Sequence, residues 1–175
     1  TDHTIALSKA TRSDLRSHFS VPTDAVSEIA LAADPCFRPQ PKKECAELRG
    51  RHDLLQSYVL YLGSNKPHKN LVRLVEAWSQ VGTQFPGHTL VIAGAWIPDY
   101  PEPRQRAEAL GLASIRWLGR VAEEDLPALY SAAEAFVFPS LYEGFGLPVL
   151  EAMACGTPVT CSQTSSLPEI AGDAA

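Results

Sequence analysis

Short apolar runs that alternate with amphipathic stretches, from residue 58 onward, limit most strongly how this chain can fold. The runs YVLYLG at 58–63 and HTLVIAG at 88–94 have the length of strands, and their apolar residues are consecutive rather than alternate. Strands of this kind are buried on both faces, as in parallel sheets. The stretch from 70 to 81 instead repeats its apolar residues at helical spacing, at Leu71, Leu74, Val75 and Trp78.

The same pattern predicts the order of the elements that follow. Strands are expected at five apolar runs, 58–63, 88–94, 114–119, 135–139 and 157–161. Helices are expected between them, at 70–81, 104–110, 123–133 and 148–154. This alternation implies right-handed crossovers and an α/β fold with a doubly wound, Rossmann-like parallel sheet. Ligands of such sheets bind beyond the carboxyl ends of the strands, so a site is expected on the loops at 63–70, 94–103, 119–123 and 139–148.

The first 56 residues have a different character. The elements expected there are a strand at 4–7, the entry of a helix at 8–15, a strand at 24–32, a connection at 34–42 and a polar helix or loop at 43–56. The chain begins at Thr1 rather than Met and ends at Ala175 in the middle of the pattern. We therefore expect it to be a piece of a longer protein.

Composition and charge argue against some classes of function. A formal net charge of −5 and an isoelectric point near 5.5 provide no basic surface for nucleic acid. The apolar runs are much shorter than the ~20 residues that a membrane-spanning helix needs. The four cysteines form no CxxC pair and have no neighbouring histidine, which favours reduced thiols in a cytoplasmic protein over a zinc site.

The segment EGFGLPVLE, from Glu143 to Glu151, has the composition of an anion-binding loop. Its two glycines allow a sharp turn and a close approach to a ligand, and Pro148 suits the first position of a helix. Free amides from Gly144 to Leu147 would then face an anion such as a diphosphate. We expect Glu151 in the first helical turn and Glu143 just before the helix, so that both carboxylates border one cleft and accept hydrogen bonds from sugar hydroxyls. The alternative is a glycine-rich turn in which Glu151 only complements the helix dipole.

A second loop with suitable charge follows the first buried strand. The segment SNKPHKN at 64–70 offers Lys66, His68 and Lys69 before the next helix. Because it opens at the same edge of the sheet, a lysine here could meet a phosphate as a point charge. The alternative is a solvated basic loop in which Asn70 caps the helix.

A third candidate is Gly119-Arg120-Val121, which follows another predicted strand and could border a nucleobase or a phosphate. The alternative is a simple strand exit. The sequence contains no D-x-D triplet and no carboxylate cluster with the spacing of a hard-metal site, so no metal site is predicted. Neutralising a diphosphate would then fall to Lys69 and the helix amides.

Several motifs, in this order, resemble those of glycosyltransferase family four, whose members are retaining enzymes with the GT-B fold. The E-x7-E motif is complete as EGFGLPVLE and is followed by AMACGTPV. Further similar segments are LYLGSNKPHKNL at 60–71, LVIAG at 90–94 and SLPEIAGDAA at 166–175, while IALSKATRSDL and DPCFRP resemble the lead-in from an N-terminal domain. The resemblance therefore implies a lead-in at 1–42 and a Rossmann-like donor-binding domain at 43–175, truncated at its C-terminus.

The resemblance also assigns roles to individual residues. Lys69 matches the lysine that binds the diphosphate, Glu151 the carboxylate that binds the ribose, and Glu143 the residue that contacts the transferred sugar. Catalysis would rest on Glu143 and Lys69. One departure is Ser64, which stands where many members have an arginine, so Lys66 or Arg120 would have to supply a second cation. The expected donor-binding set is Gly63, Ser64, Lys69, Gly94, Arg120, Val121, Glu143, Gly144, Phe145, Gly146, Leu147 and Glu151.

By this resemblance the chain is half of an enzyme that transfers a hexosyl group, for example mannosyl or glucosyl, from a UDP-sugar or GDP-sugar without a cofactor. The acceptor would be a glycan or lipid-linked sugar bound by the missing N-terminal domain, in polysaccharide or glycolipid biosynthesis. The parent protein could associate peripherally with a membrane, and the fragment alone should have little activity. Two alternatives stay open: a sugar phosphorylase or sugar-phosphate synthase on the same fold, and a non-catalytic nucleotide-sugar-binding module.

Overall fold

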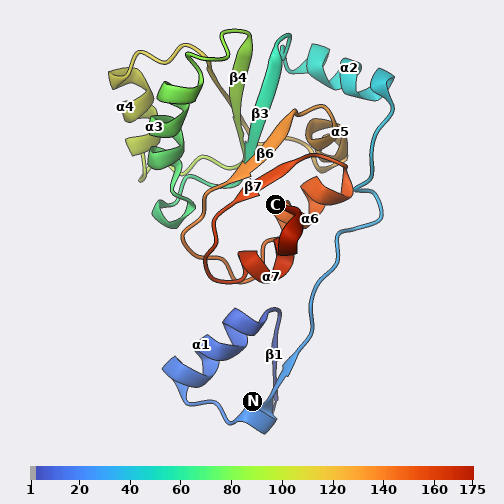
Figure 1. Cartoon of the computed structure of the whole chain (residues 1–175), viewed down its shortest axis with the longest axis vertical. Coiled ribbons are helices and arrows are strands. Elements are labelled where there is room, and N and C mark those ends of the chain that lie inside the picture. Colours follow the sequence, from blue (N-terminus) through green and yellow to red (C-terminus); the bar gives the residue numbers. More distant parts are fainter. Residues whose placement is uncertain (1–2) are drawn as a thin grey trace.

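The computed structural model describes residues 3–175, and its main body is a five-stranded parallel sheet (Figure 1). The strands are β3 (Ser57–Leu62), β4 (His88–Ala93), β5 (Ile115–Gly119), β6 (Ala135–Phe138) and β7 (Val159–Cys161). Their order across the sheet is β5-β4-β3-β6-β7, and every neighbouring pair is parallel. The chain builds outward in one direction from β3 to β5 and in the other from β6 to β7. This order confirms the predicted doubly wound α/β fold.

Helices cover both faces of this sheet (Figure 1). On one face, α3 (Leu71–Val81) packs against α4 (Glu102–Ala109). On the other face, α5 (Leu126–Ser131) contacts both α2 (Lys42–Arg51) and α6 (Leu147–Ala154). The short helix α7 (Leu167–Ala171) follows β7 and packs on α6. Of the helices in the described residues, none is both long enough and apolar enough to cross a bilayer.

The central strands are apolar because helices cover both of their faces. In β4 the four consecutive residues from Leu90 to Ala93 are all buried. The buried residues of α3 are the four that helical spacing predicted, Leu71, Leu74, Val75 and Trp78. These side chains belong to one core cluster shared by the sheet and its helices. The predicted burial on both faces is therefore confirmed.

Residues 4–28 form a small unit below the sheet in Figure 1. Its elements are β1 (Thr4–Ala6), α1 (Lys9–Phe19), the 3-10 turn η1 (Thr23–Ala25) and β2 (Val26–Glu28), with β1 and β2 paired in parallel. Ser8 caps α1 by accepting a hydrogen bond from the amide of Thr11 at 3.0 Å. The expected strand at 24–32 is wrong in its extent. It ends at Glu28 because β1 offers only three residues for pairing.

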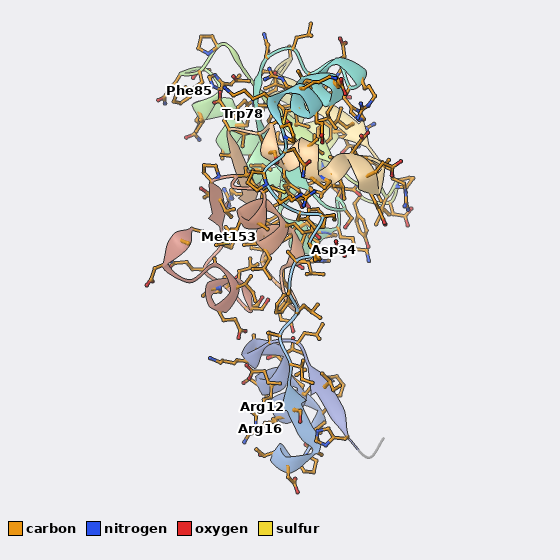
Figure 2. All side chains as sticks on the ribbon, turned by 90° about the vertical axis from the view of Figure 1, so that its right-hand side faces the viewer. Arg12, Arg16, Asp34, Trp78, Phe85 and Met153 are labelled. Atoms are coloured by element: carbon orange, nitrogen blue, oxygen red, sulfur yellow. The ribbon has the colours of Figure 1, made fainter. Side chains whose placement is uncertain are left out.

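An extended linker at 29–41 joins this unit to the main body (Figure 2). The linker contacts α5 before α2 begins. The ring of Phe37 meets Tyr130 edge-on, with 6.0 Å between the ring centroids. The amide of Gln40 donates to Oγ of Ser131 at 3.1 Å. The linker is therefore fixed to the helix that also packs against α6.

Hydrogen bonds dock the N-terminus of α1 onto the main body. The carboxylate of Glu169, in α7, accepts from the first two amides of α1 at 3.0 and 3.1 Å. The hydroxyls of Ser8 and Thr11 both donate to the carbonyl oxygen of Gly144, at 2.8 and 2.9 Å. A carboxylate at this end of a helix satisfies amides that lack a partner within the helix and complements the helix dipole. The small unit is thus held against the turn that precedes α6.

Replacing Glu169 with alanine should loosen α1 without disturbing the sheet. The substitution removes both acceptors of the first two α1 amides. Hydrogen exchange of the α1 amides should then speed up by roughly fivefold, as for the loss of an ordinary helix cap. The amides of α3 should keep their rates and serve as the internal control. Unchanged exchange in α1 would show that Glu169 does not stabilise this helix.

Candidate functional site

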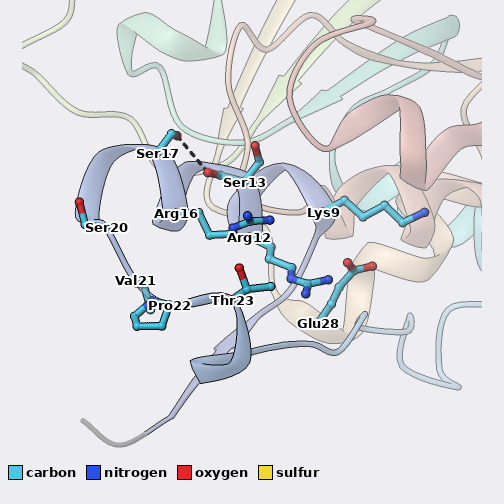
Figure 3. A pocket seen from close by; sticks show the side chains of 10 residues that line it. All are labelled: Lys9, Arg12, Ser13, Arg16, Ser17, Ser20, Val21, Pro22, Thr23 and Glu28. Carbon is cyan, nitrogen blue, oxygen red and sulfur yellow. Dashed lines mark hydrogen bonds between the residues drawn. The ribbon is translucent and has the colours of Figure 1, made fainter.

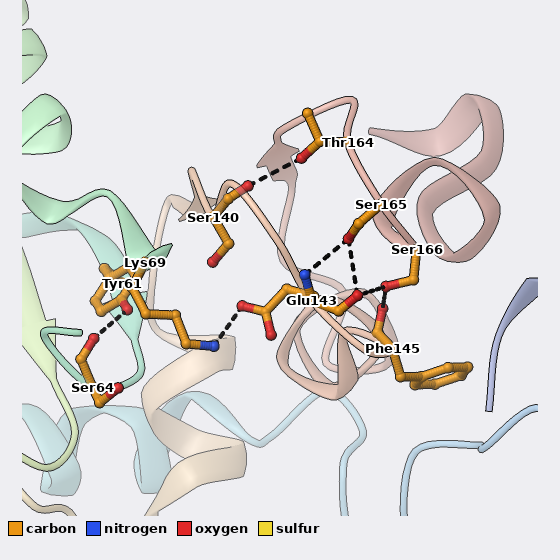
Figure 4. A network of polar contacts seen from close by, with 9 residues as sticks. All are labelled: Tyr61, Ser64, Lys69, Ser140, Glu143, Phe145, Thr164, Ser165 and Ser166. Carbon is orange, nitrogen blue, oxygen red and sulfur yellow. Dashed lines mark hydrogen bonds and ion pairs between the residues drawn. The ribbon is translucent and has the colours of Figure 1, made fainter. Parts of the chain in front are cut away.

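Two loops meet where the strand order changes direction, between β3 and β6. Lys69 ends η2 (Pro67–Lys69), the 3-10 turn after β3, and Glu143 lies in the loop between β6 and α6. The Nζ atom of Lys69 donates to Oε1 of Glu143 at 2.5 Å (Figure 4). The two side chains are only 17% and 14% exposed. Their attraction is therefore less screened than that of a surface ion pair.

Contacts with the end of β6 and with the residue after it hold Lys69 and Asn70 in place. Its Nζ atom lies 5.2 Å from the ring centroid of Phe138, a cation–π distance. Asn70 occupies the position before α3 that a capping residue takes, but its side chain makes no capping hydrogen bond. Instead, its Nδ2 atom donates to the carbonyl oxygen of Pro139 at 3.2 Å. Asn70 therefore ties the two loops together.

Two serines after β7 hold the backbone of Glu143 (Figure 4). Oγ of Ser165 accepts from the Glu143 amide at 2.8 Å and donates to the Glu143 carbonyl oxygen at 2.9 Å. Oγ of Ser166 lies 2.9 Å from the same carbonyl oxygen and 2.5 Å from that of Phe145, so its single proton is shared. Neither serine is among the predicted site residues. Their loop follows the parallel strand β7 and therefore begins at the same edge of the sheet, and this position was the signal in the sequence that could have identified them.

The turn from Gly144 to Leu147 leads directly into α6. Gly146 has a φ of +124°, which glycine adopts most readily, and a Cβ atom there would lie 2.8 Å from Leu167. The side chain of Phe145 is buried and anchors the turn. Within residues 3–175, the backbone amides of the four residues 144–147 have no hydrogen-bond acceptor. These N–H groups are available to an anion at the N-terminus of the helix.

The prediction that Glu151 lies in the first turn of the helix is wrong. Because α6 begins at Leu147, one residue before Pro148, Glu151 is its fifth residue and lies in the second turn. Its Oε2 atom accepts from the hydroxyl of Tyr130 at 2.8 Å. Burial raises the pKa of Glu151, and the hydrogen bond from Tyr130 opposes this shift. Tyr130 is absent from the predicted site, since its only signal in the sequence is a place on the apolar face of a helix.

Gly63 and Gly94 pack backbone against backbone at the carboxyl ends of β3 and β4. Gly94 has a φ of +120°, and a Cβ atom there would lie 2.2 Å from the carbonyl oxygen of Gly63. The amide of Gly94 donates to the carbonyl oxygen of Gly119 at 2.7 Å. Ser64 contributes its carbonyl oxygen, which accepts from the Tyr61 hydroxyl at 2.8 Å. These residues shape the sheet edge through their backbone.

Arg120 and Val121 follow β5, which lies two strands away from β3. Val121 is partly buried against the core, whereas Arg120 is exposed. Across residues 3–175 the Arg120 side chain has no hydrogen-bond or ion-pair partner. Lys66 is exposed as well. The structure therefore brings Lys69 and Glu143 together but does not bring a second cation to this pair.

A large, open hollow of about 910 Å³ lies elsewhere (Figure 3). It runs between α1 and the segment at 20–28, and its charged lining residues are the basic Lys9, Arg12 and Arg16 and the acidic Glu28. All of its lining residues belong to the small unit, and none is among the predicted site residues. Volume alone therefore does not identify the site, and the polar groups at the switch in strand order remain the candidate.

Comparisons with known proteins agree with this fold and cover most of the chain. Residues 49–175 match the family model described as "Glycosyl transferases group 1". The chain is 39% identical over 178 residues to O-antigen chain mannosyltransferase B of Escherichia coli, covering 97% of this chain and 45% of that relative. It is 32% identical over 177 residues to the serotype-specific mannosyltransferase WbdA of Escherichia coli, covering 98% of this chain and 22% of that relative. The chain thus spans less than half the length of either.

A solved structure has the same fold. The crystal structure of Anabaena Alr3699/HepE in complex with UDP and glucose superposes with a TM-score of 0.86 at 24% sequence identity. The match covers 97% of this chain and 46% of that chain. At this identity the similarity establishes the fold alone, and it confirms the predicted α/β architecture.

Substituting Gly94 by alanine should lower the free energy of unfolding by about 3 kcal/mol, because the new Cβ atom adds a backbone clash to an unfavourable φ. Gly111→Ala is the matched control: its φ is +64°, and nothing lies within 4 Å of the added atom. That variant should lose only about 1 kcal/mol. Denaturant unfolding measures both values. Equal losses in the two variants would contradict the close packing at the strand ends.

Proposed function

The chain belongs to group 1 of the glycosyl transferases, and on this premise we propose that it is the donor-binding half of a retaining, family-four enzyme. The proposed reaction transfers a hexosyl group from a nucleotide-diphosphate sugar to an acceptor hydroxyl and keeps the anomeric configuration. The observation that carries the proposal is the Lys69–Glu143 pair, whose carboxylate directly precedes the four free amides at 144–147. A cation and a row of N–H groups suit a diphosphate, while a carboxylate suits sugar hydroxyls.

Lys69 and the amides of 144–147 would stabilise the leaving diphosphate. Negative charge builds up on the diphosphate as the glycosidic bond stretches toward an oxocarbenium-like state. Groups that already point at this charge lower the barrier without having to reorganise. In the free chain Lys69 is paired with Glu143. Donor binding would draw Lys69 toward the phosphates and free Glu143 to orient the hydroxyls of the transferred sugar.

Glu151 is proposed to bind the ribose, because a carboxylate accepts hydrogen bonds from two neighbouring hydroxyls. Gly94, Arg120 and Val121 would border the base, and Gly63 with Ser64 would lie near the phosphates. The two Escherichia coli relatives are named as mannosyltransferases, and the Anabaena structure holds UDP and glucose. These names support a mannosyl or glucosyl group and a UDP carrier, and we keep GDP as the second proposed carrier.

The remaining parts of the proposal concern the whole enzyme. Residues 1–42 would lead in from an N-terminal domain that binds an acceptor glycan or lipid-linked sugar, and residues 43–175 would bind the donor. The docking of α1 on the carbonyl of Gly144 supports this division, since it sets the lead-in against the donor turn. We place the enzyme in the cytoplasm, with peripheral membrane contact at a lipid-linked acceptor. The two Escherichia coli relatives, both named as mannosyltransferases, match more of this chain than any sugar-phosphate synthase among its relatives does, and this supports transfer to an acceptor sugar.

In the whole enzyme that carries this chain, Lys69→Ala or Glu151→Ala should lower kcat/KM by roughly a hundredfold, the effect of losing one charge-stabilising group. Steady-state kinetics with the nucleotide sugar measures the loss. Lys43→Ala is the control, because this lysine on α2 is 86% exposed and, among residues 3–175, pairs only with Glu47 at 3.9 Å. Near-normal turnover in both site variants would overturn the assignment of the donor site.

A further inference from the structure

The hydroxyl of Tyr130 is aimed at Glu151 from the core of the protein. Tyr130 lies near the end of α5, and its side chain is fully buried. Its OH group donates to Oε2 of Glu151, on α6, at 2.8 Å. Across residues 3–175, no protein donor is found for the other carboxylate oxygen, Oε1. One oxygen of Glu151 is thus taken by the core, and the other is available.

The surroundings of Tyr130 hold this hydroxyl in a fixed position. The ring meets Phe136 of β6 edge-on at 5.3 Å between centroids, and Phe37 of the linker at 6.0 Å. The carbonyl oxygen of Tyr130 accepts from the Thr157 hydroxyl at 2.8 Å. A ring packed between two others, on an anchored backbone, has little freedom to turn. The hydroxyl can therefore set the orientation of the carboxylate that it binds.

We propose that Tyr130 is a positioning residue for donor recognition: its hydroxyl fixes Glu151 so that Oε1 faces the ribose hydroxyls of the nucleotide. The inference rests on the proposed function of Glu151 as the ribose-binding carboxylate. Tyr130 itself does not touch the ligand and acts through Glu151. A purely structural tyrosine would instead matter only for stability, and the two roles predict different binding data.

The protonation state of Glu151 gives a second readout. Burial raises the pKa of Tyr130 far above its ordinary value, so the tyrosine stays a donor. The thiols of Cys155 and Cys36 interact electrostatically with Glu151, and the carboxylate of Asp34 interacts with Cys36. Burial raises the pKa of Cys155 to about 11, and a hydrogen bond with Asp34 raises the pKa of Cys36. Both thiols therefore stay neutral below pH 8. The hydrogen bond from the Cys36 backbone lowers the pKa of Asp34, so this carboxylate stays charged.

Below the raised pKa of Glu151, protonation should remove its preference for ribose hydroxyls, because a neutral carboxyl accepts fewer hydrogen bonds. Losing the Tyr130 hydroxyl removes the contribution that lowers this pKa. The Tyr130→Phe variant should therefore lose the preference at a higher pH than the unsubstituted chain. The same pH dependence in both would contradict the proposal.

The test compares UDP with 2′-deoxy-UDP, and GDP with 2′-deoxy-GDP, by calorimetric titration of the chain. The quantity measured is the ratio of the two Kd values in each pair. Tyr130→Phe should shrink this ratio by roughly fivefold, the scale of one misplaced hydrogen bond. Tyr58→Phe is the matched control: this tyrosine is equally buried, and its hydroxyl donates to the Leu129 carbonyl of the same helix α5 at 2.7 Å. It should lose stability but keep the ratio.

Glu151→Gln separates this inference from the proposed function. If that substitution leaves the ratio unchanged, Glu151 does not bind the ribose, and both proposals fail at this residue. If Glu151→Gln abolishes the preference and Tyr130→Phe does not alter it, only the positioning role fails. If both reduce the preference, Tyr130→Phe should have no further effect in the Glu151→Gln background, as expected when one residue acts through the other.

Discussion

The reversal of strand order between β3 and β6 is the constraint on which the rest of this molecule depends. Right-handed crossovers that build outward in opposite directions place α3 on one face of the sheet and α6 on the other. The loops after β3 and β6 therefore start next to each other and lead to helices on opposite faces of the sheet. This geometry brings together Lys69 and Glu143, which are 74 residues apart in the sequence. It also turns the free amides before α6 toward the same edge.

Periodicity and parallel-sheet rules predicted the elements and the loops, because burial on two faces leaves a clear signal in the sequence. Those rules placed Lys69 and Glu143 at one edge of the sheet. They did not predict that the two side chains would bind each other. The roles of Tyr130, Ser165 and Ser166 depend on side-chain contacts between distant segments, for which one sequence carries no periodic signal. The start of α6 was misplaced by one residue, since Gly146 and Pro148 are both suitable boundary residues.

The small unit at 4–28 and the linker at 29–41 make two separate sets of contacts beside the candidate site. One set is made by the N-terminus of α1, whose hydroxyls bind the carbonyl of Gly144 while Glu169 caps the helix. The other is made by Phe37 of the linker, which packs on the tyrosine that binds Glu151. The turn at 144–147 and the helix that follows it are therefore both connected to the N-terminal part of the chain.

We propose that the turn at 144–147 and the loop of Lys69 hold the diphosphate of a nucleotide. The most direct measurement is an NMR titration of the chain with UDP, GDP and ADP, which follows the backbone amides. We expect at least one nucleotide to shift the amide signals of 144–147 and of Lys69 saturably. Shifts that are absent for all three, or confined to the basic groove of Lys9, Arg12 and Arg16, would contradict it.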